Sequence, residues 1–128
     1  MLIADETGLP AIGRRLAELP ARTRVVVVGE VDGAADELEE WLETETNATI
    51  TWAHRNGAAA GESDVLAKTL STLQLPAGAY YAWVACESLT AKALRRQLIA
   101  DHGANPKWTR AAGYWRRGVV AVHEVHDE

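Results

Sequence analysis

The sequence predicts an α/β fold in which five parallel strands form one sheet with helices on both faces. Strand-like apolar runs alternate five times with helical patterns, in units of about 20 to 30 residues, as is typical of such a sheet. The run Val25–Val28 is β-branched without polar alternation, which is typical of a strand covered on both faces. A length of 128 residues, 48% of them apolar, predicts a single domain over residues 1–128.

Each predicted strand is a short apolar run bounded by polar residues or by turn residues. The five strands are expected at Leu2–Ala4, Val25–Val28, Ala48–Ala53, Tyr80–Ala85 and Thr109–Trp115.

Four helices are expected between the strands, each beginning at a residue whose side-chain oxygen can cap free N–H groups. These caps are Thr7, Asp32, Ser63 and Ser88. Apolar residues at helical spacing then give each helix a buried face. The second helix is expected to bury Ala34, Leu38, Trp41 and Leu42, and the fourth Leu94, Leu98 and Ile99. Pro20 is expected to stop the first helix, and Gly103 to take the left-handed position after the fourth.

The tail adds a sixth, antiparallel strand at the edge of the predicted sheet. Residues Val119–Val125 follow a three-residue connection that ends in Gly118, which is a common hairpin connection. A valine-rich edge strand exposes unpaired backbone groups. We therefore expect a homodimer to which the tail or uncovered apolar surface nearby contributes.

The charge pattern excludes some functions and leaves one question open. A net charge of -5 argues against general nucleic-acid binding. Ten acids and one base lie between Glu30 and Asp64, whereas seven bases and one acid lie between Lys92 and Arg117. These halves are either solvated helix faces or, for the basic half, a surface for an anionic ligand or acidic partner. Without a long apolar run or a basic leader, a cytoplasmic protein is expected.

Four segments follow the predicted strands, at the edge where open α/β sheets bind their ligands. They are Asp5–Pro10, His54–Arg55, Cys86–Ser88 and Tyr114–Arg117. In the first segment, the free N–H groups of a helix N-terminus beside Gly8 could hold a phosphate, or the segment could be ordinary helix capping. The Arg55 guanidinium could clasp a phosphate, or could balance nearby acids.

Other reactive residues give weaker patterns. Cys86 lies near a helix N-terminus, where its pKa could be lowered, although buried inert cysteines are commoner. His123 and His126 would point to opposite faces of a strand, so no metal site is expected. Nothing in the sequence suggests a Ser/His/Asp nucleophile arrangement, and we assign no catalytic residue.

Five strings in order along the chain resemble signatures of the siderophore-interacting protein family. They are ADETGLPAI at Ala4–Ile12, TWAHRNG at Thr51–Gly57, YAWVACES at Tyr81–Ser88, KALRRQL at Lys92–Leu98 and GYWRRG at Gly113–Gly118. The resemblance is to the C-terminal NAD(P)H-binding domain of these ferric-siderophore reductases, which is similar to that of ferredoxin-NADP reductases. It implies that the N-terminal flavin-binding barrel is absent from this chain.

The resemblance also implies roles for the residues at the strand ends. Thr7, Gly8 and Leu9 would face the pyrophosphate, and His54 and Arg55 the adenosine ribose, where Arg55 would favour NADPH over NADH. Cys86, Glu87 and Ser88 would line the crevice near the nicotinamide, although similar proteins carry glycine at the position of Cys86. Tyr114, Trp115, Arg116 and Arg117 would lie on the side of the flavin and the ferric siderophore.

Two hypotheses follow. In the first, the chain is an NAD(P)H-binding domain of ferric-siderophore reductase type, with a role in releasing iron, and FAD would have to come from a partner domain. In the second, the chain is a non-catalytic interaction module that keeps the fold without binding a nucleotide.

Overall fold

The computed structural model of the chain describes residues 1–37, 44–61, 64–75, 78–117 and 124–126, the last three by their backbone only. Three α-helices are present in these ranges: α1 (Leu9–Glu18), α2 (Val65–Thr72) and α3 (Ser88–Asp101). Two 3₁₀ turns are η1 (Ala34–Asp36) and η3 (Pro106–Trp108). The strands are β1 (Leu2–Ala4), β2 (Arg24–Val31), β3 (Asn47–His54), β4 (Ala82–Glu87), β5 (Thr109–Trp115) and β6 (Glu124–His126).

The strands form one sheet in the order β3-β2-β1-β4-β5-β6, and the first five are parallel. The predicted five-stranded parallel sheet is therefore confirmed. After β3 the chain crosses back over β1 to add β4 on its other side, so the strand order reverses between β1 and β4. In open parallel sheets this reversal opens a crevice at the carboxyl ends of the two strands.

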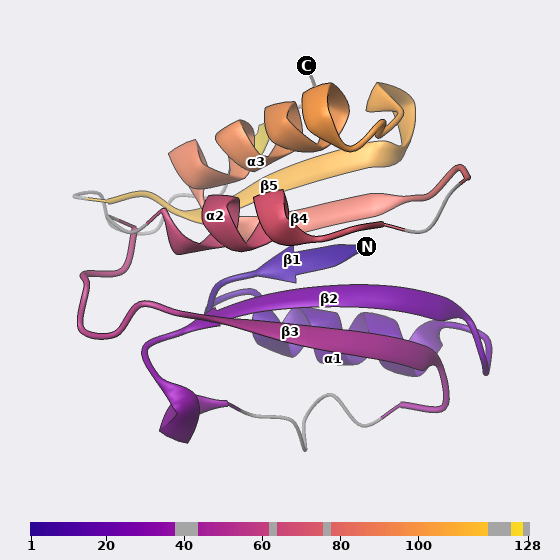
Figure 1. Ribbon diagram of the computed structural model, residues 1–128, viewed down its shortest axis with the longest axis horizontal. Helices are drawn as coiled ribbons and strands as arrows, with labels where there is room; N and C mark the ends of the chain where they lie inside the picture. Colours follow the sequence, from indigo (N-terminus) through magenta and orange to yellow (C-terminus); the bar gives the residue numbers. More distant parts are fainter. Residues whose placement is uncertain (38–43, 62–63, 76–77, 118–123, 127–128) are drawn as a thin grey trace.

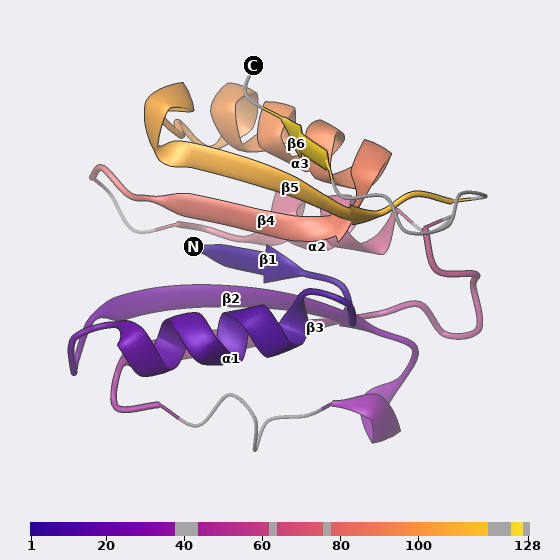
Figure 2. The same cartoon turned by 180° about the vertical axis from the view of Figure 1, so that it is seen from behind.

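Helices cover the two faces of the sheet unequally (Figures 1 and 2). On one face, α1 packs Leu9, Ile12 and Leu16 against β1 and β2 in one core cluster. On the opposite face, α2 and α3 pack against the sheet in a second cluster that includes Leu70 and Leu94. Figure 2 shows α1 below β1, with no helix of the described chain over β4 and β5 on that face.

Two of the predicted N-caps, Thr7 and Ser88, are wrong. Thr7 makes no cap for α1; its hydroxyl donates to the carboxylate of Asp5 instead. Ser88 begins α3 rather than capping it, and the Glu87 side chain accepts from the backbone of Thr90. A carboxylate accepts hydrogen bonds more strongly than a hydroxyl, which explains why Glu87 caps α3 in place of Ser88, whereas no described side chain caps α1.

The helix predicted after Asp32 does not begin where expected. The chain makes only the short turn η1, and the backbone at Glu37 is extended. The Asp32 carboxylate accepts from the Gly57 N–H at 2.9 Å rather than capping a helix. Residues Leu38, Trp41 and Leu42 lie outside the described residues, as does the predicted cap Ser63, whose helix α2 is present.

Other predicted boundaries hold closely. β5 has the predicted bounds, and Gly103 follows α3 at a φ of 66°, the left-handed region that favours glycine. β4 begins two residues later than predicted. The three residues of β6 pair antiparallel with β5. Residues 118–123 lie outside the described residues, so the hairpin over Val119–Val125 stays a prediction.

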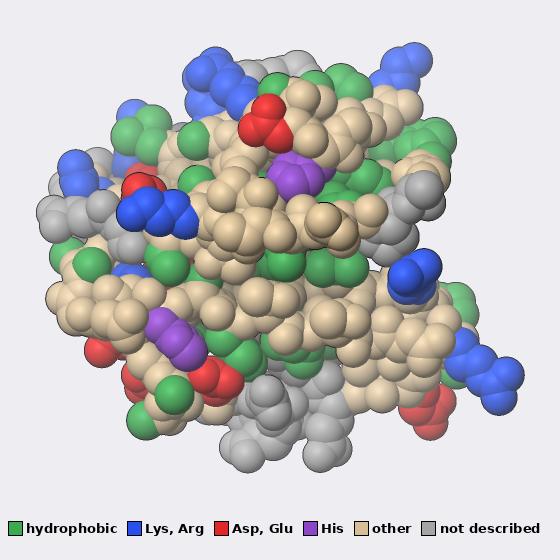
Figure 3. All heavy atoms as spheres, in the orientation of Figure 1, with side chains coloured by type: hydrophobic (Ala, Val, Ile, Leu, Met, Phe, Trp, Pro, Cys, Tyr) green, Lys and Arg blue, Asp and Glu red, His purple; other side chains and the backbone are tan. Residues whose placement is uncertain are grey.

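The two charged halves of the sequence lie in different regions of the fold. Figure 3 shows basic side chains mainly in the upper half, around α3 and β5, and acidic ones mainly in the lower half. No helix among the described residues is long and apolar enough to cross a bilayer.

Candidate nucleotide-binding site

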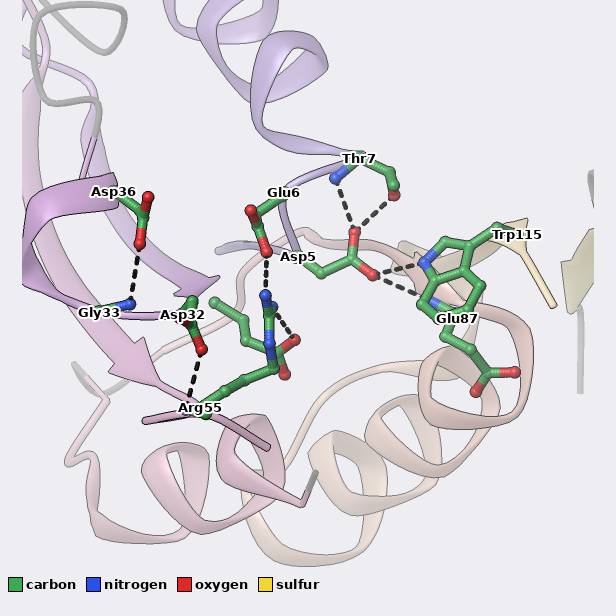
Figure 4. A network of polar contacts seen from close by, with 11 residues as sticks. Asp5, Glu6, Thr7, Asp32, Gly33, Asp36, Arg55, Glu87 and Trp115 are labelled. Atoms are coloured by element: carbon green, nitrogen blue, oxygen red, sulfur yellow. Dashed lines mark hydrogen bonds and ion pairs between the residues drawn. The ribbon is translucent and has the colours of Figure 1, made fainter. Parts of the chain in front are cut away.

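A buried aspartate lies at the point where the strand order reverses. Asp5 directly follows β1, its backbone N–H donates to the Ala85 carbonyl on β4, and the residue is 5% exposed. Its carboxylate accepts from the Thr7 N–H at 2.9 Å, the Glu87 N–H at 3.2 Å and the Trp115 indole N–H at 2.8 Å. Figure 4 shows these contacts converging on Asp5. Asp5 therefore joins the ends of β1, β4 and β5.

The loop from Thr7 to Leu9 uses its donors internally. The Gly8 and Leu9 N–H groups donate to the Asp5 carbonyl at 3.0 and 3.2 Å, and the Thr7 N–H donates to the Asp5 carboxylate. A phosphate at this loop would have to displace these contacts. A Cβ on Gly8 would lie 2.5 Å from the Ala85 carbonyl oxygen, so glycine is needed here for the loop to approach β4.

Glu87 ends β4 and points its side chain toward the start of α3. One carboxylate oxygen, Oε1, accepts from the Thr90 N–H at 3.0 Å and from the Thr90 hydroxyl at 3.2 Å. The other, Oε2, is buried and makes no hydrogen bond within the described part of the chain. Burial raises the pKa of Glu87, but the hydrogen bonds from Thr90, together with the nearby backbone N–H groups of Leu89 and Arg117, outweigh it and leave the pKa below its ordinary value.

Glu87 borders a cavity of about 330 Å³ between α2, α3 and the end of β5. Arg116 and Arg117 line its far side, and the exposed Asp64 lies at the start of α2. An ionised carboxylate can only accept hydrogen bonds, and a buried acceptor without a donor is unfavourable. The cavity therefore suits a group that carries N–H or O–H donors beside negative charge.

Trp115 contacts both Asp5 and Gly61, a residue that lines this cavity. A β-bulge places Glu87 opposite Trp115, with Tyr114 as the additional residue on β5. The Trp115 ring also packs under the Gly61 backbone, where a Cβ would lie 2.7 Å from the ring. Tyr114 instead meets the Trp83 ring edge-on, with centroids 6.0 Å apart, in the core cluster on the α1 face. The structure thus separates Tyr114 from Trp115.

Arg55 lies just after β3 and pairs with two acids. Its Nη1 lies 3.0 Å from Glu30 Oε2, its Nη2 contacts Glu6, and its side chain is 8% exposed. Glu30 is itself 4% exposed, whereas the Glu6 side chain is 48% exposed. Burial raises the pKa of Glu30 despite the Arg55 hydrogen bond. Of the two partners, Glu6 is therefore the one that a ligand could displace.

Two predicted residues have other surroundings. His54 Nε2 lies 2.8 Å from Glu37 Oε2, at the end of β3. Cys86 is 1% exposed and lies in the core cluster beneath α3. Burial, with the negative charges of Asp5, Glu30 and Glu87, raises the pKa of the Cys86 thiol well above its ordinary range. The alternative of a lowered Cys86 pKa is wrong, and its side chain does not line the cavity.

Sequence reasoning placed the candidate site at the carboxyl ends of the strands, which stays a prediction, and it assigned no role to the acids that lie there. Asp5, Glu6 and Glu30 were not among the predicted ligand-binding residues. The position of Asp5, directly after the first strand, is the signal that could have identified it. No group of three or more His, Cys, Asp or Glu side chains suited to a metal is found among the described residues.

Comparison with known proteins gives a consistent result. A family model described as "Siderophore-interacting protein" matches residues 1–118. The "NADPH-dependent ferric-chelate reductase" of Escherichia coli (strain K12) is 28% identical over 118 residues, which cover 90% of this chain and 43% of that protein.

Two solved structures share the fold. A siderophore utilization protein from T. fusca has a TM-score of 0.82 at 41% identity, over 94% of this chain and 46% of that one. The siderophore-interacting protein from Acinetobacter baumannii has a TM-score of 0.72 at 29% identity, over 92% and 46%. The chain thus spans slightly less than half the length of these relatives.

Proposed function

Because the chain belongs to the siderophore-interacting protein family, we propose that it binds NADPH, or NADH, at the carboxyl ends of β1 and β4 as part of a ferric-siderophore reductase. The nicotinamide end would enter the cavity beside Glu87. The observation that carries the proposal is the buried Oε2 of Glu87, an acceptor without a donor among the residues that the structure describes. The carboxamide N–H₂ of nicotinamide is a donor of the required kind.

Positive charge beside Glu87 would suit the negatively charged parts of the bound molecules. Arg116 and Arg117 line the same cavity, and guanidinium groups pair well with phosphates and carboxylates. The nucleotide would supply hydride to a flavin, and the flavin would pass single electrons to iron. FAD would come from a further domain or a partner protein, and the ferric siderophore would meet this chain through that domain.

Glu87→Gln is expected to weaken NADPH and NADH equally, by about tenfold, the effect of losing one hydrogen bond to a charged group. The glutamine can still accept from Thr90 through its oxygen, but its N–H₂ then faces the ligand's donor. Isothermal titration calorimetry would give both dissociation constants. Asp64→Asn is the matched control: it removes an exposed carboxylate that lines the same cavity and is expected to change neither constant more than about twofold.

Choice between the nucleotides would rest on Arg55. The 2′-phosphate of NADPH would take the place of the exposed Glu6 on Nη2, while Glu30 stays on Nη1. In the same titrations, Glu6→Gln should therefore strengthen NADPH by about two- to fivefold, the range for an exposed charge pair, and leave NADH unchanged. Equal changes for both nucleotides would remove Arg55 from this role. Glu18→Gln, on the exposed side of α1, serves as the charge-matched control.

A specific observation favours a second candidate, an interaction module without nucleotide binding. The donors at Thr7–Leu9 and at the start of α3 already bond to Asp5 and Glu87, so the two helix N-termini offer little to a phosphate. Absence of any heat with millimolar NADPH and NADH would favour this candidate and exclude the first.

We further propose that the chain forms a homodimer through the β6 edge of the sheet. β6 ends the strand order, and an uncovered edge invites pairing with another chain. Light scattering at tens of micromolar should report a dimer for the intact chain and a monomer for a version ending at Gly118. A monomeric intact chain, or a dimer that survives the truncation, would exclude this role for the tail.

A further inference from the structure

A second cavity lies at the opposite end of the sheet, where the strands begin. It has a volume of about 570 Å³ and is bounded by the end of α1, the starts of β2, β4 and β5, and the turn η3. On the side of α1, β4 and β5 carry no helix of the described chain (Figure 2), so the cavity lies beside an uncovered part of the sheet. The proposed nucleotide site does not use it.

The charge of this cavity is of one sign. Its lining includes the four bases Arg15, Arg24, Lys107 and Arg110 and no acid, although acids outnumber bases in the chain as a whole. Two of these bases belong to the basic half of the sequence. Four positive groups around one hollow favour an anionic ligand.

Aromatic rings provide the flat surfaces of the same cavity. Tyr81 is 72% exposed and packs against Trp108, with ring centroids 5.3 Å apart at 34°. The Arg15 guanidinium lies 4.3 Å from the centroid of the Trp83 ring, within the range of a cation–π contact. Exposed rings beside cations suit a planar aromatic ligand that can stack on them.

A buried arginine fixes the wall that carries Trp108 and Lys107. Arg95 is 2% exposed; its Nε donates to the Thr109 carbonyl at 3.1 Å and its Nη2 to the Pro106 carbonyl at 3.0 Å. These bonds hold both ends of η3 against α3. The ring of Trp108 is thus carried by a turn that is fixed before any ligand binds, which lowers the entropic cost of binding.

We propose that this cavity binds a planar aromatic carboxylate, with the ring stacked on Tyr81 and Trp108 and the carboxylate held by Arg110 and Lys107. Its volume lies within the usual range of about 300 to 1,000 Å³ for small-molecule sites. Since the cavity and the nucleotide site lie at opposite ends of the sheet, the ligand and NADPH are expected to bind independently.

The test is a titration of the intact chain with 2-naphthoate. Binding is measured by calorimetry and, in NMR spectra, by the shifts of the tryptophan indole N–H resonances. A dissociation constant on the order of 0.1 to 1 mM is expected for a ligand of this size, with shifts of the Trp83 and Trp108 resonances. Arg110→Gln and Trp108→Ala should each weaken binding about fivefold to tenfold. Arg14→Gln, which removes an exposed base of α1 outside the cavity, should leave it unchanged.

Three results would overturn the proposal. The first is binding of the neutral 2-naphthamide as tight as that of 2-naphthoate, which would mean that the bases play no part. The second is a weakening by Arg14→Gln equal to that by Arg110→Gln, which would indicate attraction by overall charge; full displacement of 2-naphthoate by hexaglutamate would likewise overturn the proposal, because it would indicate an acidic peptide as the partner. The third is no resonance shift at 10 mM 2-naphthoate. Because NADPH is absent from these titrations, their outcome does not depend on the nucleotide site.

Discussion

Asp5→Ala is expected to lower the free energy of unfolding by about 2 to 4 kcal/mol, because it removes a buried acceptor that serves three donors at once. The Thr7 N–H, the Glu87 N–H and the Trp115 indole N–H all lose their acceptor, and the Glu87 N–H, which is buried, costs about 1 to 3 kcal/mol when left unsatisfied. The ends of three strands lose their connection together. Urea unfolding followed by tryptophan fluorescence would measure the change.

Asp36→Ala is the matched control for Asp5→Ala. The Asp36 carboxylate accepts one hydrogen bond, from the Gly33 N–H at 3.2 Å, and is exposed, so water can replace it. A loss below about 1 kcal/mol is expected. Similar losses for the two variants would show that the Asp5 contacts contribute no more than an ordinary surface turn.

Local sequence patterns predicted the fold class, an α/β fold with a parallel sheet, but not the order of the strands within the sheet. Alternating strand and helix patterns predict parallel strands because a crossover between parallel strands is usually a helix, and the β-branched Val25–Val28 lies in β2 as expected. The helix caps failed for a local reason: several oxygens compete for the same N–H groups. At α3 the Glu87 carboxylate replaces the Ser88 hydroxyl as the cap, and before α1 the Thr7 hydroxyl donates to Asp5 instead of capping the helix. Only the folded geometry shows which acid reaches which donor.

The candidate site was predictable as an edge of the sheet rather than as a set of contacts. Arg55 was identified as the single base of an acidic stretch, but its partners lie 49 and 25 residues away in the sequence. They meet it because β3 lies beside β2 and β2 beside β1. Such pairings depend on strand order and register, and the pattern of charges along the chain contains no information about either.

The failure of Asp32 to begin a helix has the same kind of cause. Asp32 bonds to Gly57, and Glu37 bonds to His54, so both side chains point to the loop and strand that follow. A helical pattern in the sequence competes here with long-range contacts that no local signal reports.

Arg55→Ala is expected to lower the free energy of unfolding at pH 7 by about 3 to 5 kcal/mol, the cost of leaving one partner of a buried ion pair alone. Glu30 is the partner left behind: it is 4% exposed, and burial already raises its pKa with Arg55 in place. Lys68→Ala is the control. Its pair with Asp64 is 3.3 Å long, with side chains 75% and 69% exposed, and should contribute no more than about 0.5 kcal/mol.

The pH dependence and a double variant identify Glu30 as the cause of that loss. Without Arg55, the pKa of Glu30 in the folded state should rise further above its ordinary value of 4.5. Between the two pKa values of Glu30, the folded variant holds a proton that the unfolded chain has released. The stability of the variant therefore falls as the pH rises toward and through the pKa of the folded state, and it recovers as the pH is lowered toward the pKa of the unfolded state. The stability deficit relative to the parent chain should therefore shrink as the pH is lowered from 7 to 5, as measured by urea unfolding.

Glu30→Gln combined with Arg55→Ala should recover most of the loss at pH 7, since a neutral amide is less costly to bury than an unpaired carboxylate. A deficit independent of pH and equal in the single and double variants would place the cost in the lost packing of the arginine side chain instead.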